Sequence, residues 1–211
     1  MREAEMNSRI RVLNASPGSF AFDILLDKSP AIAQVAYGQL SDYVTLSPER
    51  HQVRILPAGV HWPESEILDD HLAKLRPGYD YTLIAVGEME DLQLVLLEDI
   101  TQVPGLDRAK VRFFHASPDA PAVDVGMTGE PALFRQVPFT QATPIVEVET
   151  GTVDLEVRRA GHPDVTIATL PEYTLVAERL YTFVALGLLD GQPPFTIKPI
   201  VVPVRRCVPA G

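Results

Sequence analysis

The sequence predicts an all-β protein made of two tandem antiparallel β-sandwich modules, immunoglobulin-like or transthyretin-like in type. Three observations lead to this prediction. A series of motifs in the first half of the chain recurs in the second half. Short runs alternate between apolar and polar residues, which is the period of a strand with one buried face. The chain also has 19 prolines, and proline is typical of turns and edge strands and disfavours helix interiors.

The repeat fixes the domain organisation. Four landmarks recur in the same order, namely residues 9–17 as 110–118, 21–24 as 122–125, 58–59 as 160–161 and 81–87 as 181–187. The offset between the copies stays nearly constant, so we expect one fold in both copies with small differences in loop length. We therefore predict two modules, residues 1–103 and 104–211, joined around Pro104-Gly105.

Each copy is expected to hold seven or eight short strands. Arg9–Leu13 and Lys110–His115 alternate charged and apolar residues, which predicts strands with one buried face. Tyr79–Gly87 and Leu180–Gly187 are almost wholly apolar and should be central strands covered on both faces. Glu64–Leu75 has apolar residues at helical spacing, but its counterpart in the second copy is strand-like, so we expect a strand there too.

Composition excludes several classes of function. The net charge is −10, and an acidic chain repels phosphate backbones, so we expect no nucleic-acid partner. The single cysteine, Cys207, can form neither an intrachain disulfide nor a cysteine-rich zinc site. The lone Trp62 lies in a His-Trp-Pro turn, so the Cys–Trp–Cys signature of antibody domains is missing. The chain as read shows no signal peptide and no apolar run long enough to span a membrane, which by itself favours the cytoplasm, and we leave the location unassigned.

A run in the second copy carries a family resemblance. Residues 115–125, His-Ala-Ser-Pro-Asp-Ala-Pro-Ala-Val-Asp-Val, resemble a signature of the bacterial family called domain of unknown function 4397. The first copy departs from it, with Asn14 in place of the histidine and residues 18–20 in place of Asp-Ala-Pro. The resemblance implies β-sandwich modules, often exported or displayed at the cell surface, and it implies no reaction.

The same run contains the residue types of a serine nucleophile system. A hydrolase would use His115, Ser117 and Asp124, because serine catalysis needs a base beside the hydroxyl and a group that orients the base. However, Ser117 precedes Pro118 in a turn without a Gly-x-Ser-x-Gly elbow. We therefore favour a structural turn and keep the following as weak candidates for ligand contact: His115, Ser117, Asp119, Asp124, Asn14, Ser16 and Asp23.

The two Ser-Pro turns should be equivalent. We expect Ser16 to match Ser117 and Asp23 to match Asp124, each bonding turn or backbone groups. Asn14 replaces His115 in the first copy, which preserves a hydrogen-bonding role and removes a base.

No metal or cofactor site is predicted. His51, His61 and His71 lie ten residues apart, a spacing without ligand meaning, and no calcium loop or glycine-rich phosphate loop occurs. Sugar stacking could use the six tyrosines, but most fall in strand patterns, where packing is the ordinary role. These are Tyr37, Tyr43, Tyr79, Tyr81, Tyr173 and Tyr181.

The leading functional hypothesis is a non-enzymatic binding or structural protein, which presents a rigid pair of β-sandwiches for protein–protein interaction. The alternative is binding of carbohydrate or another cell-envelope polymer, and the hydrolase ranks third. A fold alone does not decide between them, because function resides in sites placed on folds.

Overall fold

The computed structural model describes residues 7–59, 68–99 and 103–204. The chain divides into two compact units, Met1–Ile100 (unit 1) and Thr101–Gly211 (unit 2). Trp62, His61 and Cys207 lie outside the described residues, so the expectations for them stay predictions.

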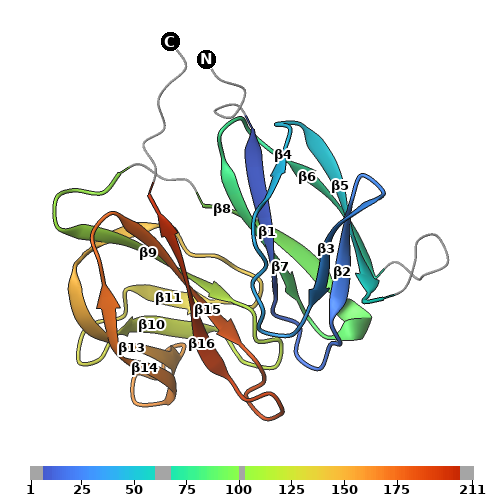
Figure 1. Cartoon of the computed structure of the whole chain (residues 1–211). Coiled ribbons are helices and arrows are strands. Elements are labelled where there is room, and N and C mark those ends of the chain that lie inside the picture. Colours follow the sequence, from blue (N-terminus) through green and yellow to red (C-terminus); the bar gives the residue numbers. More distant parts are fainter. Residues whose placement is uncertain (1–6, 60–67, 100–102, 205–211) are drawn as a thin grey trace. The chain divides into compact units, whose positions relative to one another are not determined.

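Two four-stranded sheets form the described part of unit 1, in the strand orders β4-β1-β7-β8 and β3-β2-β5-β6 (Figure 1). A short 3₁₀ helix, η2, connects β7 to β8. The elements are β1 (Ser8–Asn14), β2 (Phe22–Leu26), β3 (Ser29–Val35), β4 (Val44–Leu46), β5 (Arg50–Pro57), β6 (Asp69–Lys74), β7 (Asp80–Val86), η2 (Met89–Asp91) and β8 (Gln93–Glu98).

Unit 2 repeats this topology strand for strand, in the orders β12-β9-β15-β16 and β11-β10-β13-β14. Its strands are β9 (Arg108–His115), β10 (Val123–Met127), β11 (Phe134–Val137), β12 (Val146–Glu149), β13 (Gly151–Arg159), β14 (Thr166–Leu175), β15 (Arg179–Leu186) and β16 (Thr196–Pro203). The predicted all-β fold of two sandwich-like units is confirmed, with eight strands in the described part of each.

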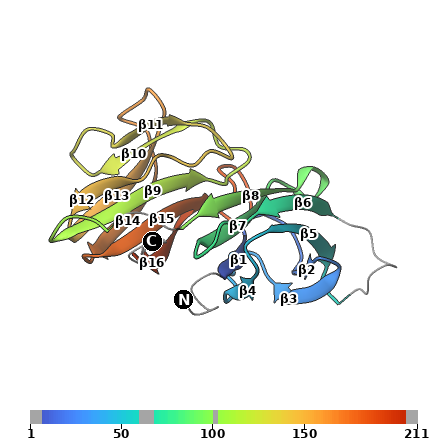
Figure 2. The ribbon, with the colours of Figure 1, turned by 90° about the horizontal axis from the view of Figure 1, so that it is seen from above.

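Among the strands that the structure describes, the pairing is antiparallel except for one pair in each unit. β1 runs parallel to β7, and β9 runs parallel to β15. Figure 2 shows these pairs from a second side. Strands that pair in parallel need a long crossover between them, and here the crossover contains the whole second sheet of the unit together with β4 in unit 1 or β12 in unit 2.

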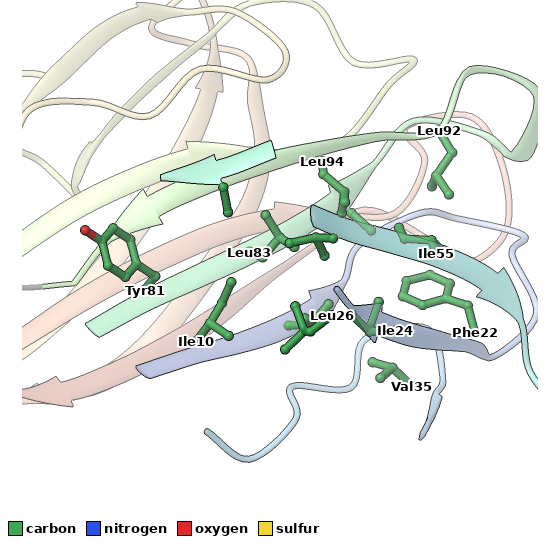
Figure 3. Close-up of a cluster of buried hydrophobic side chains, with 14 of the residues drawn as sticks. Ile10, Phe22, Ile24, Leu26, Val35, Ile55, Tyr81, Leu83, Leu92 and Leu94 are labelled. Carbon is green, nitrogen blue, oxygen red and sulfur yellow. The ribbon is translucent and has the colours of Figure 1, made fainter. Parts of the chain in front are cut away.

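A buried apolar cluster lies between the two sheets of each unit. In unit 1 it includes Phe22, Ile24, Ile55 and Leu83 (Figure 3). The cluster of unit 2 contains the corresponding side chains of β9, β10, β13 and β15. Full burial of such side chains contributes about 1.5–3 kcal/mol each, so this packing is the main source of stability for each sandwich.

The burial of the central strands β7 and β15 agrees with the prediction, and the burial of the first strands, β1 and β9, differs from it. All seven residues of β7 are buried, which confirms a strand covered on both faces. β1 and β9 were expected to have one buried face, yet Arg11 and Arg112 are buried as well. Their Nε atoms donate to Thr82 Oγ1 (2.9 Å) and Thr182 Oγ1 (2.7 Å). Hydrogen bonding lowers the cost of burying a charge, which is why an alternating pattern here does not mark an exposed face.

Two glycines at equivalent positions are fixed by sterics. Gly87 and Gly187 follow β7 and β15 with φ of +88° and +83°. A Cβ atom would lie 2.5 Å from Asp91 O at the first position and 2.3 Å from Pro194 O at the second. Only glycine fits such a conformation and approach, which explains this landmark of the repeat.

The segment with helical spacing is a strand where the structure describes it. β6 covers Asp69–Lys74 and pairs with β5, as its counterpart β14 pairs with β13. Residues 60–67 lie outside the described part of the chain.

Candidate functional site

The entrance of each Ser-Pro turn has the same hydrogen bond. Asn14 Oδ1 accepts from the backbone N–H of Ser16 (3.1 Å), and His115 Nδ1 accepts from the backbone N–H of Ser117 (3.3 Å). His115 is fully buried, and its Nε2 donates to Pro121 O (3.0 Å). Burial lowers the pKa of His115, and this effect is larger than the opposing effect of the hydrogen bond to Pro121. The ring is therefore neutral and has a turn-capping role.

Asp119 ties the turn of unit 2 to a second loop. Its carboxylate accepts from the backbone N–H groups of Leu189 (2.8 Å) and Asp190 (3.0 Å), and from Ser117 Oγ (3.3 Å). Burial opposes its ionisation, but these hydrogen bonds together lower the pKa of Asp119. The carboxylate therefore joins the β9–β10 loop to the β15–β16 loop.

Asp23 and Asp124 make matching backbone contacts. Asp23 accepts from Gln34 N (2.7 Å) and Gly59 N (3.0 Å). Asp124 accepts from Gln136 N (2.7 Å) and Gly161 N (3.1 Å), the equivalent groups of unit 2. Each carboxylate holds a bulge on one neighbouring strand and a turn on the other.

His115, Ser117 and Asp124 are not hydrogen-bonded in series. The histidine bonds Pro121, the serine hydroxyl bonds Asp119, and the aspartate bonds two backbone N–H groups. A base within reach of the nucleophile is the geometric requirement for serine catalysis. The bonds that these side chains make are those of turns.

A different Asp–His–Ser arrangement occurs in unit 1. His51 Nδ1 lies 2.6 Å from Asp27 Oδ2, and its Nε2 lies 2.8 Å from Ser47 O and 3.4 Å from Ser47 Oγ. The Ser47 hydroxyl donates to Glu49 Oε1 (2.5 Å). Sequence reasoning did not find this arrangement, because its three residues come from β5 and from two turns that are separate in the sequence.

Both ring nitrogens of His51 face oxygen acceptors, so the doubly protonated ring satisfies both. Burial disfavours this charge, but the hydrogen bonds with Asp27 and the Ser47 carbonyl outweigh it and raise the pKa of His51. The hydrogen bond between His51 and Asp27 is also the largest cause of the lowered pKa of Asp27. Because both ring nitrogens already face these oxygen atoms, the ring is poorly placed to act as a general base on the Ser47 hydroxyl, and it fills a corner of the sandwich.

The equivalent corner of unit 2 is open. A groove of about 370 Å³ lies at the end of the sandwich where β9 begins and where β10 and β12 end. Its walls are mainly apolar, and its rim is charged. The lining residues are Met127, Pro131, Leu133, Val148 and Val153, with Arg108, Glu130 and Glu149.

Strand register shows that the two corners correspond. The pairing of β2 with β5 matches that of β10 with β13, and the pairing of β1 with β4 matches that of β9 with β12. These registers align Val153 with His51, Met127 with Leu26, Val148 with Leu46 and Glu149 with Ser47. The His51 ring of unit 1 is thus replaced by the Val153 side chain in unit 2.

Loop length also separates the two corners. In unit 1, Asp27 (φ 51°) and Lys28 (φ 72°) connect β2 to β3, a tight turn of two residues with positive φ. The β10–β11 connection, residues 128–133, is longer and supplies one wall of the groove. This wall packs on Gly126, where a Cβ atom would lie 3.1 Å from Ala132 Cα and Pro131 O.

Five of the six tyrosines pack against neighbouring side chains. Tyr173 and Tyr181 form an edge-on pair with ring centroids 5.8 Å apart, and Tyr79 lies 6.3 Å from Tyr81. The Tyr43 ring lies under the guanidinium of Arg11, 4.6 Å from the ring centroid. These contacts match the packing role predicted for them.

The described residues contain no group of three or more His, Cys, Asp or Glu side chains placed to hold a metal ion. None of their helices is long and apolar enough to cross a membrane.

Comparison with known proteins gives a family. The family model described as "Domain of unknown function (DUF4397)" matches residues 8–126, which is more than half of the chain. No curated protein matches the sequence.

Two solved structures resemble the chain distantly. One is the CBMbc module (family CBM26) of Eubacterium rectale Amy13K in complex with maltoheptaose, at 11% identity and a TM-score of 0.27, covering 95% of this chain and 98% of that one. The other is titled "Alpha-glucan binding by a streptococcal virulence factor", at 8% identity and a TM-score of 0.26, covering 93% of this chain and 97% of that one. Such low scores carry no argument about ligands.

Proposed function

Because the chain belongs to the family described as a domain of unknown function (DUF4397), whose name assigns no activity, we propose its function from the groove. Unit 2 is a non-catalytic binding module that holds an exposed segment of a partner protein in the groove lined by Met127, Leu133 and Val153.

The observation that carries this proposal is the difference between the two copies. Ordinary cores are packed without voids, and unit 1 follows that rule by filling its corner with the buried His51 ring. Unit 2 leaves the corresponding volume open behind a longer loop. The groove volume lies in the roughly 300–1,000 Å³ range of ligand pockets, which suits a few side chains of a partner.

At three of the eight edge strands of the described sheets, the sequence disfavours strand addition as a binding mode. Three edge strands carry a proline, which are Pro30 in β3, Pro171 in β14 and Pro199 in β16. Proline removes a backbone donor and protects an edge from pairing with another chain. A partner strand therefore finds a poor template at these edges.

Affinity capture from an extract of the source organism tests the proposal. The immobilised chain is compared with Leu133→Lys in the groove and with Leu72→Lys as a matched control, since both leucines are exposed (39% and 57%). A protein retained by the native chain and by Leu72→Lys, but lost with Leu133→Lys, supports the proposal.

Two outcomes would contradict it. If the native chain and both variants capture the same protein equally well, the groove does not take part in the interaction. Retention of the native chain on insoluble polysaccharide, lost in Leu133→Lys, would assign the groove to the carbohydrate alternative.

A further inference from the structure

We infer that the segment bound in the groove carries an arginine or lysine side chain next to an apolar one. This inference rests on the proposed binding function of the groove and adds the chemistry of its occupant.

The charges of the rim favour a cation. Glu130 is exposed, and the Glu149 side chain is 90% exposed, whereas Arg108 is the single cation among the lining residues. Arg108 Nη1 lies 3.3 Å from Glu149 Oε1, so its charge is already compensated. The lining therefore has one carboxylate in excess, on a chain of net charge −10, and this combination attracts positive groups.

The walls favour a long aliphatic stem below that charge. Met127, Val148 and Val153 are partly buried and pack at the edge of the core of unit 2. Lysine and arginine bury their methylene stems on apolar surfaces and keep the charged end in water. An aliphatic stem on these walls, with its charge at Glu130, satisfies both parts of the groove.

Unit 1 provides an internal precedent for this occupant. There the same corner holds a basic side chain, the His51 ring, with Nδ1 2.6 Å from Asp27 Oδ2 and Nε2 2.8 Å from the Ser47 carbonyl oxygen. Val153 and Thr128 stand at the positions of His51 and Asp27 in unit 2. A cationic side chain of a partner would fill the groove of unit 2 in the way that the chain's own His51 ring fills the equivalent corner of unit 1.

Methyl NMR of the full chain tests the inference with three probes. These are acetyl-Leu-Arg-Leu-amide, acetyl-Leu-Glu-Leu-amide and maltoheptaose, each titrated while the methyl signals of Met127, Leu133 and Val153 are followed. We expect the arginine peptide to shift these signals with a dissociation constant of order 1 mM, and the glutamate peptide to bind at least fivefold more weakly.

Charge variants give the matched control. Glu130→Gln/Glu149→Gln should weaken the arginine peptide about fivefold. Glu88→Gln/Glu90→Gln changes the net charge equally on an exposed segment of unit 1 and should change the affinity less than twofold.

The possible failures are distinguishable. If the glutamate peptide binds as tightly as the arginine peptide, the inference is wrong and the groove remains a binding site. If only maltoheptaose shifts the signals, both the protein partner and its cationic side chain are excluded. If none of the probes shifts them, the proposed function fails together with the inference.

Discussion

The two copies agree at one end of the sandwich and differ at the other. At the turn end, Asn14 and His115 cap the same backbone group, and Asp23 and Asp124 bond equivalent N–H groups. At the opposite end, unit 1 has the buried His51 ring beside the exposed Asp27 carboxylate, and unit 2 has an open groove. Repeated contacts at one end show what the fold requires, so divergence at the other end shows where a function is free to develop.

Truncating the turn cap should have the largest effect. His115→Ala removes a buried ring and leaves the Ser117 N–H and the Pro121 carbonyl without their partner. We expect a loss of about 3 kcal/mol in the free energy of unfolding, measured by urea denaturation. His115→Asn copies the first unit and should cost only about 1 kcal/mol. Equal losses for both variants would show that the ring has a role that Asn14 does not share.

The paired aspartates should give a smaller and equal effect. Asp23→Ala and Asp124→Ala each remove two backbone hydrogen bonds to a carboxylate, and each should cost about 1–2 kcal/mol. Asp42→Ala, on an exposed residue, is the control and should stay within about 0.5 kcal/mol. A large loss in one copy alone would break the equivalence of the two turns.

The two histidines should give opposite pH dependences. The raised pKa of His51 means that its contribution to stability is full below about pH 6.5, the unfolded value, and is lost as pH rises through the folded pKa. The lowered pKa of His115 means that its contribution is present above about pH 6.5 and is lost as pH falls towards the folded pKa. Urea midpoints between pH 5 and 8.5 measure both effects.

Single substitutions assign the two slopes. His51→Gln should remove the loss on the alkaline side, and His115→Asn should remove the loss on the acidic side. If both slopes survive in both variants, other groups cause them.

Chelation should have the smallest effect. We expect no change in Tm when EDTA is added, because metal removal destabilises only a fold that gains free energy from binding. A drop of several degrees would mean that a metal site contributes to one of the units.

Sequence reasoning predicted the fold well and the groove not at all. The repeat and the apolar runs 79–87 and 180–187 set the topology, because burial and strand period are local properties of the chain. Arg11 was misjudged, since its buried hydrogen bond to Thr82 joins residues far apart in sequence. The seven turn candidates were found as motifs, but the expected equivalence of the two serines is incomplete, because Ser117 Oγ donates to Asp119 whereas Ser16 Oγ is buried without a hydrogen-bond partner.

The groove could not be predicted from the sequence, because it becomes apparent only when the equivalent corners of the two units are compared. Val153 and Leu133 look like ordinary strand residues. Only the alignment of Val153 with His51 through strand register shows that a filled corner in one copy is open in the other. A longer loop after β10 was the one visible sign, and loop length alone does not specify a groove.

The most direct test is to transplant the filled corner into unit 2. Thr128→Asp/Val153→His places the Asp27–His51 pair at the equivalent positions, and binding of acetyl-Leu-Arg-Leu-amide is then measured by methyl NMR. If the groove is the binding site, the affinity should fall at least tenfold, while amide signals of the turn at Asp119 stay unchanged. An affinity within twofold of the native value, in a variant with that unchanged spectrum, would contradict the account.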